Sequence, residues 1–126
     1  MLQQQPNNAS ALNALGYLLV NKNTQLDEAK ILIERSLEIA PDNPAALDSL
    51  GWLHFKLGNN QLALHYLKQA YSKQPDPEIA AHLGELLWYL KLFGKAASVW
   101  QQGLDIAPNH PVLIETINRL NAPKTQ

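Results

Sequence analysis

The chain has 126 residues, of which 46% are hydrophobic and 17% charged, a balance typical of one folded domain. Ten Lys and Arg residues against eleven Asp and Glu residues give a net charge of −1. This balance argues against nucleic acid or an anionic membrane surface as the main partner, because both need a basic face. The absence of Cys excludes disulfides, thiolate zinc sites and a cysteine nucleophile. No run approaches the roughly 18 apolar residues of a membrane span, so we expect no direct membrane insertion by this chain.

Three Leu-Gly pairs divide the chain into copies of one pattern. Their glycines are Gly16, Gly51 and Gly84, so the period is 35 and then 33 residues. An Ala follows each Gly after 12 or 13 residues, and a Pro follows each Ala after 12. These landmarks are Ala29, Ala63 and Ala96, then Pro41, Pro75 and Pro108. Two landmarks that keep the same spacing through three copies indicate an internal repeat.

Each copy contains two stretches in which apolar residues recur every three or four positions, which is typical of amphipathic helices. A Gly inside a helix costs about 1 kcal/mol relative to Ala, so we expect close packing between the two helices of a pair at each Gly. Before the second helix of the first copy, Thr24 and Asp27 resemble a capping box. The patterns predict helices over residues 10–21, 26–39, 44–57, 60–73, 77–91, 94–106 and 111–120.

The repeated pattern resembles the tetratricopeptide repeat (TPR). The second copy contains Leu50-Gly51, then the small Ala63, the bulky Leu67 four residues later and a closing Pro75. The resemblance covers residues 6–120. It implies an all-α fold, a right-handed solenoid of three helix-turn-helix repeats at 9–43, 44–76 and 77–110, plus a C-terminal capping helix at 111–120.

The two ends of the chain lie outside these repeats. Residues 1–8 are expected to be the tail of a preceding repeat, which would make the chain a fragment of a longer array; a short N-terminal arm is the alternative. Residues 121–126 are expected to be disordered.

No pattern of catalytic residues is visible. The four histidines lie on different helices or loops, without the spacing of a zinc site, and the sequence contains no glycine-rich phosphate loop. They are His54, His65, His82 and His110, and we interpret them as structural. The sequence therefore predicts no enzyme, no catalytic residue, no metal site and no cofactor.

One face of the first helix in each pair lies away from the leucines that form the predicted core. The TPR resemblance implies that this face lines a concave groove, which would bind a peptide or a helix of another protein. The predicted groove residues are Asn13, Tyr17, Val20, Asn21, Asp48, Trp52, Phe55, Lys56, Glu85, Trp88 and Tyr89. Large exposed aromatics are typical of binding hot spots. The first hypothesis is thus a protein-interaction module, a scaffold or adaptor.

A structural role is the alternative. The chain would then be the C-terminal segment of a longer solenoid whose groove is buried by other repeats. This hypothesis predicts that the isolated chain self-associates through an N-terminal face around Leu12, Leu15 and Leu18, which sedimentation at several concentrations would detect.

TPR proteins that bind heat-shock chaperones hold a C-terminal carboxylate with Lys, Asn, Asn, Lys and Arg. None of the corresponding positions matches; they are Asn13, Tyr17, Ser49, Glu78 and His82. The acidic C-terminal tail of a heat-shock chaperone is therefore not expected as a ligand. Acidic residues beside the aromatics, among them Asp48 and Glu85, favour an apolar ligand with a basic residue.

Three runs also resemble the C-terminal repeats of large proteobacterial TPR lipoproteins at the outer membrane. The runs span residues 47–52, 75–85 and 110–116. If this resemblance holds, it implies a location on the periplasmic side of the outer membrane. The sequence alone assigns no compartment.

Overall fold

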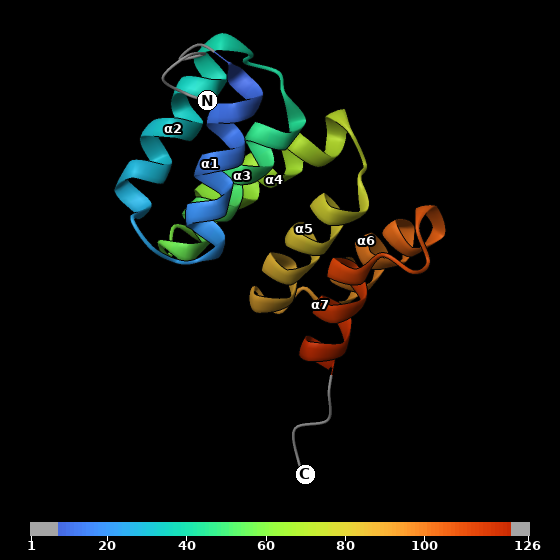
Figure 1. The fold of residues 1–126 in the computed structure, drawn as a ribbon. Helices are drawn as coiled ribbons and strands as arrows, with labels where there is room; N and C mark the ends of the chain where they lie inside the picture. The colour runs from blue at the N-terminus through green and yellow to red at the C-terminus, as the bar shows by residue number, and fades with distance from the viewer. Residues whose placement is uncertain (1–7, 122–126) are drawn as a thin grey trace. The chain divides into compact units, whose positions relative to one another are not determined.

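The computed structural model describes residues 8–121, and these residues form seven α-helices and no strand (Figure 1). The predicted all-α class is therefore confirmed. The helices divide into two compact units, one ending at Lys73 and the other beginning at Gln74, and each is described by itself. Residues 1–7 and 122–126 lie outside the described residues, and with them most of the predicted N-terminal arm and C-terminal tail.

The first unit contains two helix pairs. The helices are α1 (Ala9–Asn21), α2 (Leu26–Ile39), α3 (Pro44–Lys56) and α4 (Asn60–Lys73). Helix α1 packs against α2 and α3 against α4, while α3 also contacts α1 and α2. A core cluster joins the two pairs, with Val20, Ala29, Ile33, Leu50, Trp52 and Leu53 buried in it.

The second unit contains one helix pair and a last helix. The helices are α5 (Pro77–Tyr89), α6 (Phe93–Ile106) and α7 (Pro111–Asn121). Helix α7 contacts both α5 and α6, so it covers the end of the pair as the predicted capping helix would.

The first helix of each pair begins in the same way. The residue eight positions before each repeat Gly is an N-cap whose side-chain oxygen accepts backbone N–H bonds: Asn8 from Ala11, Asn43 from Ala45 and Ala46, and Asp76 from Glu78. In α3 and α5 a Pro follows directly, where its missing N–H costs nothing.

The predicted bounds of the seven helices agree with the observed ones to within two residues.

The start of α2 differs from the prediction. Its N-cap residue is Gln25, which adopts a left-handed conformation with φ 49° and makes no side-chain capping bond. The predicted capping box of Thr24 and Asp27 is therefore wrong. The backbone turn from α1, in which the Thr24 N–H bonds to the Leu19 carbonyl, replaces it.

The repeat glycines lie where two helices of a pair approach most closely. A Cβ on Gly16 would lie 2.6 Å from Cγ1 of Ile33, and a Cβ on Gly51 would lie 2.7 Å from Cγ of Leu67. At Gly84 the added carbon would overlap the indole of Trp100. The expected close packing is thus confirmed. In each pair the residue that packs against the Gly is the bulky one four positions after the repeat Ala.

We predict opposite effects for two Gly-to-Ala substitutions in the second unit. Gly84→Ala should lower the free energy of unfolding by about 1–3 kcal/mol, because the new methyl group overpacks against Trp100. Gly94→Ala, in α6, should raise it by up to about 1 kcal/mol, because no atom lies within 4 Å of the added carbon. Urea unfolding followed by circular dichroism measures both. Equal effects of the two variants would contradict the close approach at Gly84.

Candidate functional site

The predicted groove residues of the first unit differ widely in exposure. Asn21 and Lys56 are exposed, and Asn13 and Tyr17 are half-buried. The side-chain oxygen of Asn13 is itself buried and has no hydrogen-bond partner within residues 8–121. Tyr17 packs against the core cluster of its unit.

Three further residues of the predicted groove are buried. Val20 is 0% exposed and belongs to the core cluster, so it is a core residue and offers no surface to a ligand. Asp48 is 6% exposed. Helical periodicity had placed these side chains on the ligand-facing side, but it gives no information on what covers that side.

Trp52 is the third buried residue and the clearest departure from the prediction. It is 6% exposed, belongs to the core cluster, and stacks on Phe55 with ring centroids 5.0 Å apart. Above its ring lies the ammonium of Lys56, 5.1 Å from the centroid, in cation–π geometry. Truncation of Trp52 would therefore damage the core, and it cannot serve as a test of binding.

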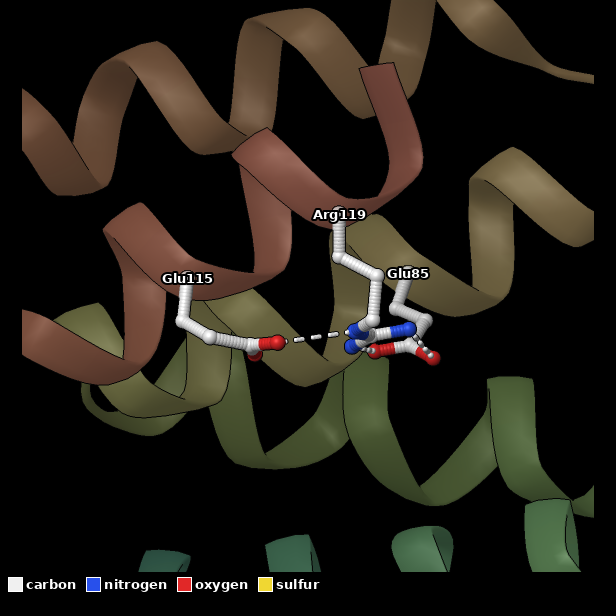
Figure 2. A network of polar contacts seen from close by, with 3 residues as sticks. All are labelled: Glu85, Glu115 and Arg119. Atoms are coloured by element: carbon white, nitrogen blue, oxygen red, sulfur yellow. Dashed lines mark hydrogen bonds and ion pairs between the residues drawn. The ribbon is translucent and has the colours of Figure 1, made fainter. Parts of the chain in front are cut away.

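In the second unit, Glu85 already has a partner from the same chain. The Nη1 and Nη2 atoms of Arg119, on α7, donate to its two carboxylate oxygens at 3.2 and 2.9 Å (Figure 2). The Nε atom of Arg119 donates to Glu115 at 3.0 Å. The Glu85 side chain is 8% exposed and that of Arg119 is 44% exposed. These bonds raise the pKa of Arg119 above its ordinary value.

This pairing removes the basis for expecting a basic ligand at Glu85. Its charge is matched by Arg119, and of the two other acidic residues of that argument, Asp48 is buried and Glu78 lies half-buried in the first turn of α5. The sequence contained the signal, because Glu85 and Arg119 are separated by 34 residues, one repeat length. Opposite charges one repeat apart on first helices are placed to meet where those helices stack.

The remaining predicted groove residues, Trp88 and Tyr89, lie in an aromatic cluster at the end of α5. The Trp88 ring meets the rings of Tyr89 and Phe93 edge-on, at centroid distances of 5.3 and 5.7 Å. Tyr89 is 51% exposed and Phe93 53% exposed, with Leu92 between them 41% exposed. The sequence analysis missed Leu92 and Phe93, because it considered only the first helix of each pair.

The predicted N-terminal face is partly exposed. Leu12 is 1% exposed and therefore part of the core, whereas Leu15 and Leu18 are exposed. Self-association through this face stays a prediction, with Leu15 and Leu18 as its candidate contacts.

His54 has a structural environment. The residue is 7% exposed, its ring stacks on that of Tyr66 with centroids 5.8 Å apart, and its Nδ1 lies 3.3 Å from Nδ2 of Asn59. Burial lowers the pKa of His54 below its ordinary value; Lys30 lowers it further and Glu34 opposes this.

No group of three or more His, Asp or Glu side chains in residues 8–121 is placed to hold a metal ion. No helix in the same range is both long and apolar enough to cross a membrane.

The helix pairs, the close approach at each Gly and the last capping helix together define a TPR protein. A family model described as tetratricopeptide repeat matches residues 7–75, more than half of the chain, and a second model with that description matches residues 49–111. The chain therefore belongs to the TPR family.

Individual relatives agree with this assignment. The chain is 44% identical over 125 residues to the TPR repeat-containing protein PA4667 of Pseudomonas aeruginosa; the match covers 99% of this chain and 21% of that protein. The crystal structure of MamA has a TM-score of 0.73 at 19% identity, over 94% of this chain and 70% of that one. YrrB, described as a TPR protein with an unusual peptide-binding site, has a TM-score of 0.67 at 25% identity, over 96% of this chain and 62% of that one.

These similarities support a role in the broad class of protein-interaction scaffolds. The chain spans only about a fifth of the length of its Pseudomonas relative, at 21%.

We predict that Arg119 stabilises α7 on α5 through the buried Glu85. Arg119→Leu leaves the carboxylate without its partner and should lower the free energy of unfolding by about 1–3 kcal/mol, less than for a fully buried pair because Arg119 is partly exposed. The double variant Glu85→Leu/Arg119→Leu should recover most of this loss. Glu115→Gln, which alters only an exposed pair within α7, should cost less than about 0.5 kcal/mol. Urea unfolding tests the series, and equal losses for Arg119→Leu and Glu115→Gln would contradict it.

We also predict that His54 makes stability depend on pH. Its pKa is lower in the folded chain than the ordinary 6.5, so the unfolded chain binds the proton more readily. Stability is therefore highest above pH 6.5 and falls as the pH drops below 6.5 toward the pKa of the folded state.

The test compares Tm between pH 7.5 and 5.5 for three chains. His54→Gln should reduce the fall in Tm, whereas His65→Gln, at an exposed position on α4, should leave it unchanged. An unchanged pH dependence in His54→Gln would show that another group is responsible.

Proposed function

We infer that this chain is a protein-interaction module that binds a partner through the aromatic end of its second unit. The aromatic end is defined as Trp88, Tyr89, Leu92 and Phe93. It retains two of the residues predicted to line the groove and adds the last residue of the turn, Leu92, and the first residue of α6, Phe93.

The observation that carries this proposal is the exposure of the cluster. Tyr89 and Phe93 are each about half exposed, at 51% and 53%, although both rings lie next to Trp88. Exposed aromatics that are adjacent and held by ring contacts present a large, rigid apolar area at little cost in side-chain entropy. Such groups are favourable anchors for a partner.

The first unit offers a weaker surface for the same purpose. Its aromatics Tyr17, Trp52 and Phe55 pack against the core cluster, and Lys56 covers the Trp52 ring. Their burial supports a role in packing one helix pair on the next. The proposal therefore confines the binding residues to the end of α5 and the turn that follows.

We predict that Tyr89→Ala weakens binding without weakening the fold. A library of random 12-residue peptides displayed on phage would be selected against the unmodified chain, and the enriched peptides would be synthesised for titration. Loss of an exposed anchor should cost about 1 kcal/mol or more, roughly fivefold in Kd. The midpoint of urea unfolding should change little, because half of the Tyr89 side chain is exposed.

Leu62→Ala is the matched control. Leu62 lies on α4 in the first unit and is 45% exposed, so its truncation removes a similar fraction of exposed apolar surface away from the aromatic end. Its Kd should equal that of the unmodified chain. Equal affinities of all three chains, or no enrichment of peptides at all, would overturn the proposed function.

A further inference from the structure

We propose that the aromatic end takes an apolar segment of a partner protein that carries acidic residues. The inference rests on the proposed function and adds the chemical class of the ligand. It reverses the charge preference expected from the sequence, which was a basic ligand.

The side chains of the aromatic end determine that part of the ligand must be apolar. Trp88 lies at its centre, half-buried, with the rings of Tyr89 and Phe93 against it. Leu92 adds an aliphatic side chain that is 41% exposed. A partner segment with one or two large apolar side chains would cover this surface and remove it from water.

The charges around the cluster are positive. Lys91 lies in the turn and Lys95 in the first turns of α6, and both are exposed. Between Glu85 and Asp105 the sequence contains no Asp or Glu.

The nearest acidic groups do not offset these lysines. Glu85 is engaged by Arg119, and Arg119 also holds Glu115. Glu78 lies in the first turn of α5 and Asp105 in the last turn of α6, each more than about 15 Å along its helix from the aromatic end. The electrostatic potential at this surface therefore favours an acidic ligand.

The backbone at Lys91 supports a role for this turn beyond connection. Lys91 adopts a left-handed conformation with φ 66°, as do Asn23 and Gly58 at the same position of the other two turns. Gly and Asn adopt this conformation readily, whereas a Lys is strained there by roughly 1 kcal/mol. Strain of this kind is found at binding sites; Gln25 shows it as well, but at Lys91 it falls on the residue directly before Leu92 and Phe93 of the aromatic end.

A protein segment is favoured over an anionic membrane as the ligand. Electrostatic binding to anionic lipid typically uses clusters of about four to eight basic residues. The aromatic end has two lysines, and the net charge of the chain is −1. Two cations suit a short acidic segment in which one or two carboxylates flank the apolar anchors.

The test uses three fluorescent 12-residue peptides with the same Leu and Trp positions. Their remaining positions are mostly Asp and Glu, mostly Lys, or only Ser and Gln, and binding is followed by anisotropy at 50 mM salt. Vesicles of phosphatidylglycerol and of phosphatidylcholine form a separate arm. The acidic peptide should bind about threefold to tenfold more tightly than the neutral one, and this advantage should shrink at 500 mM salt.

Two double variants test the lysines directly. Lys91→Asn/Lys95→Gln removes both charges and keeps a residue that tolerates the left-handed turn, so it should abolish the advantage of the acidic peptide. Lys91→Asp/Lys95→Glu should transfer the advantage to the basic peptide. Lys22→Glu/Lys68→Glu, at exposed positions of the first unit, should leave the order of the three peptides unchanged.

The outcomes separate this inference from the proposed function. If the three peptides bind equally, or the Lys91 and Lys95 variants change nothing, while Tyr89→Ala weakens all binding, the acidic ligand is overturned and the binding surface stands. Binding of phosphatidylglycerol vesicles without binding of the acidic peptide would also overturn it. If Tyr89→Ala changes no affinity, the proposed function itself fails.

Discussion

The structure depends on one repeated contact, in which the second helix of a pair lies directly on a glycine of the first. Gly16, Gly51 and Gly84 leave room for Ile33, Leu67 and Trp100, and each added Cβ would meet these side chains within van der Waals distance. Without a Cβ the helix backbones come closer and the bulky side chain has no exposed surface left, or almost none. The energetic cost of Gly inside a helix is thus offset by packing that only Gly permits.

The residue after each repeat Gly shows how successive first helices pack within each unit. In the first unit this position holds Trp52, which packs into the core cluster with Val20 from α1. In the second unit it holds Glu85, and Arg119 occupies the same position of α7, so a charged pair replaces the aromatic contact. Both solutions stabilise the stacking of first helices, one by apolar burial and one by charge-assisted hydrogen bonds. A position that the family pattern suggested for a ligand is therefore used here for the fold.

The sequence predicted the elements well because each depends on short-range chemistry. Helical periodicity, Asn and Asp caps before Pro, and the spacing of Gly and Ala are all visible in one window of residues, and the helix bounds follow from them. The candidate site was harder to predict, because periodicity identifies the face on which Val20 or Trp52 lies but gives no information on what covers that face. Leu92 and Phe93 were not predicted for a related reason. Their exposure depends on the conformation of the turn between α5 and α6, and the periodicity of these two helices does not predict that conformation. The Glu85–Arg119 pair could have been predicted, since its separation equals the repeat length.

The turn between α5 and α6 has a Lys at its left-handed position, where the other two turns have Asn and Gly. All three turns pass through a left-handed residue seven positions after the repeat Gly, and the sequence supplies Asn23, Gly58 and then Lys91. Asn23 and Gly58 suit that conformation, whereas Lys91 does not; Gln25, directly before α2, is a second residue that adopts it against its preference. A residue whose preferred backbone conformation differs from the one that it adopts is typical of functional sites, where a constraint other than folding acts on it. At this turn the left-handed Lys91 lies directly before Leu92 and Phe93, which are exposed together with Tyr89. The proposed ligand at the aromatic end would give both features a role, because it would contact the exposed rings and pair with the charge of Lys91.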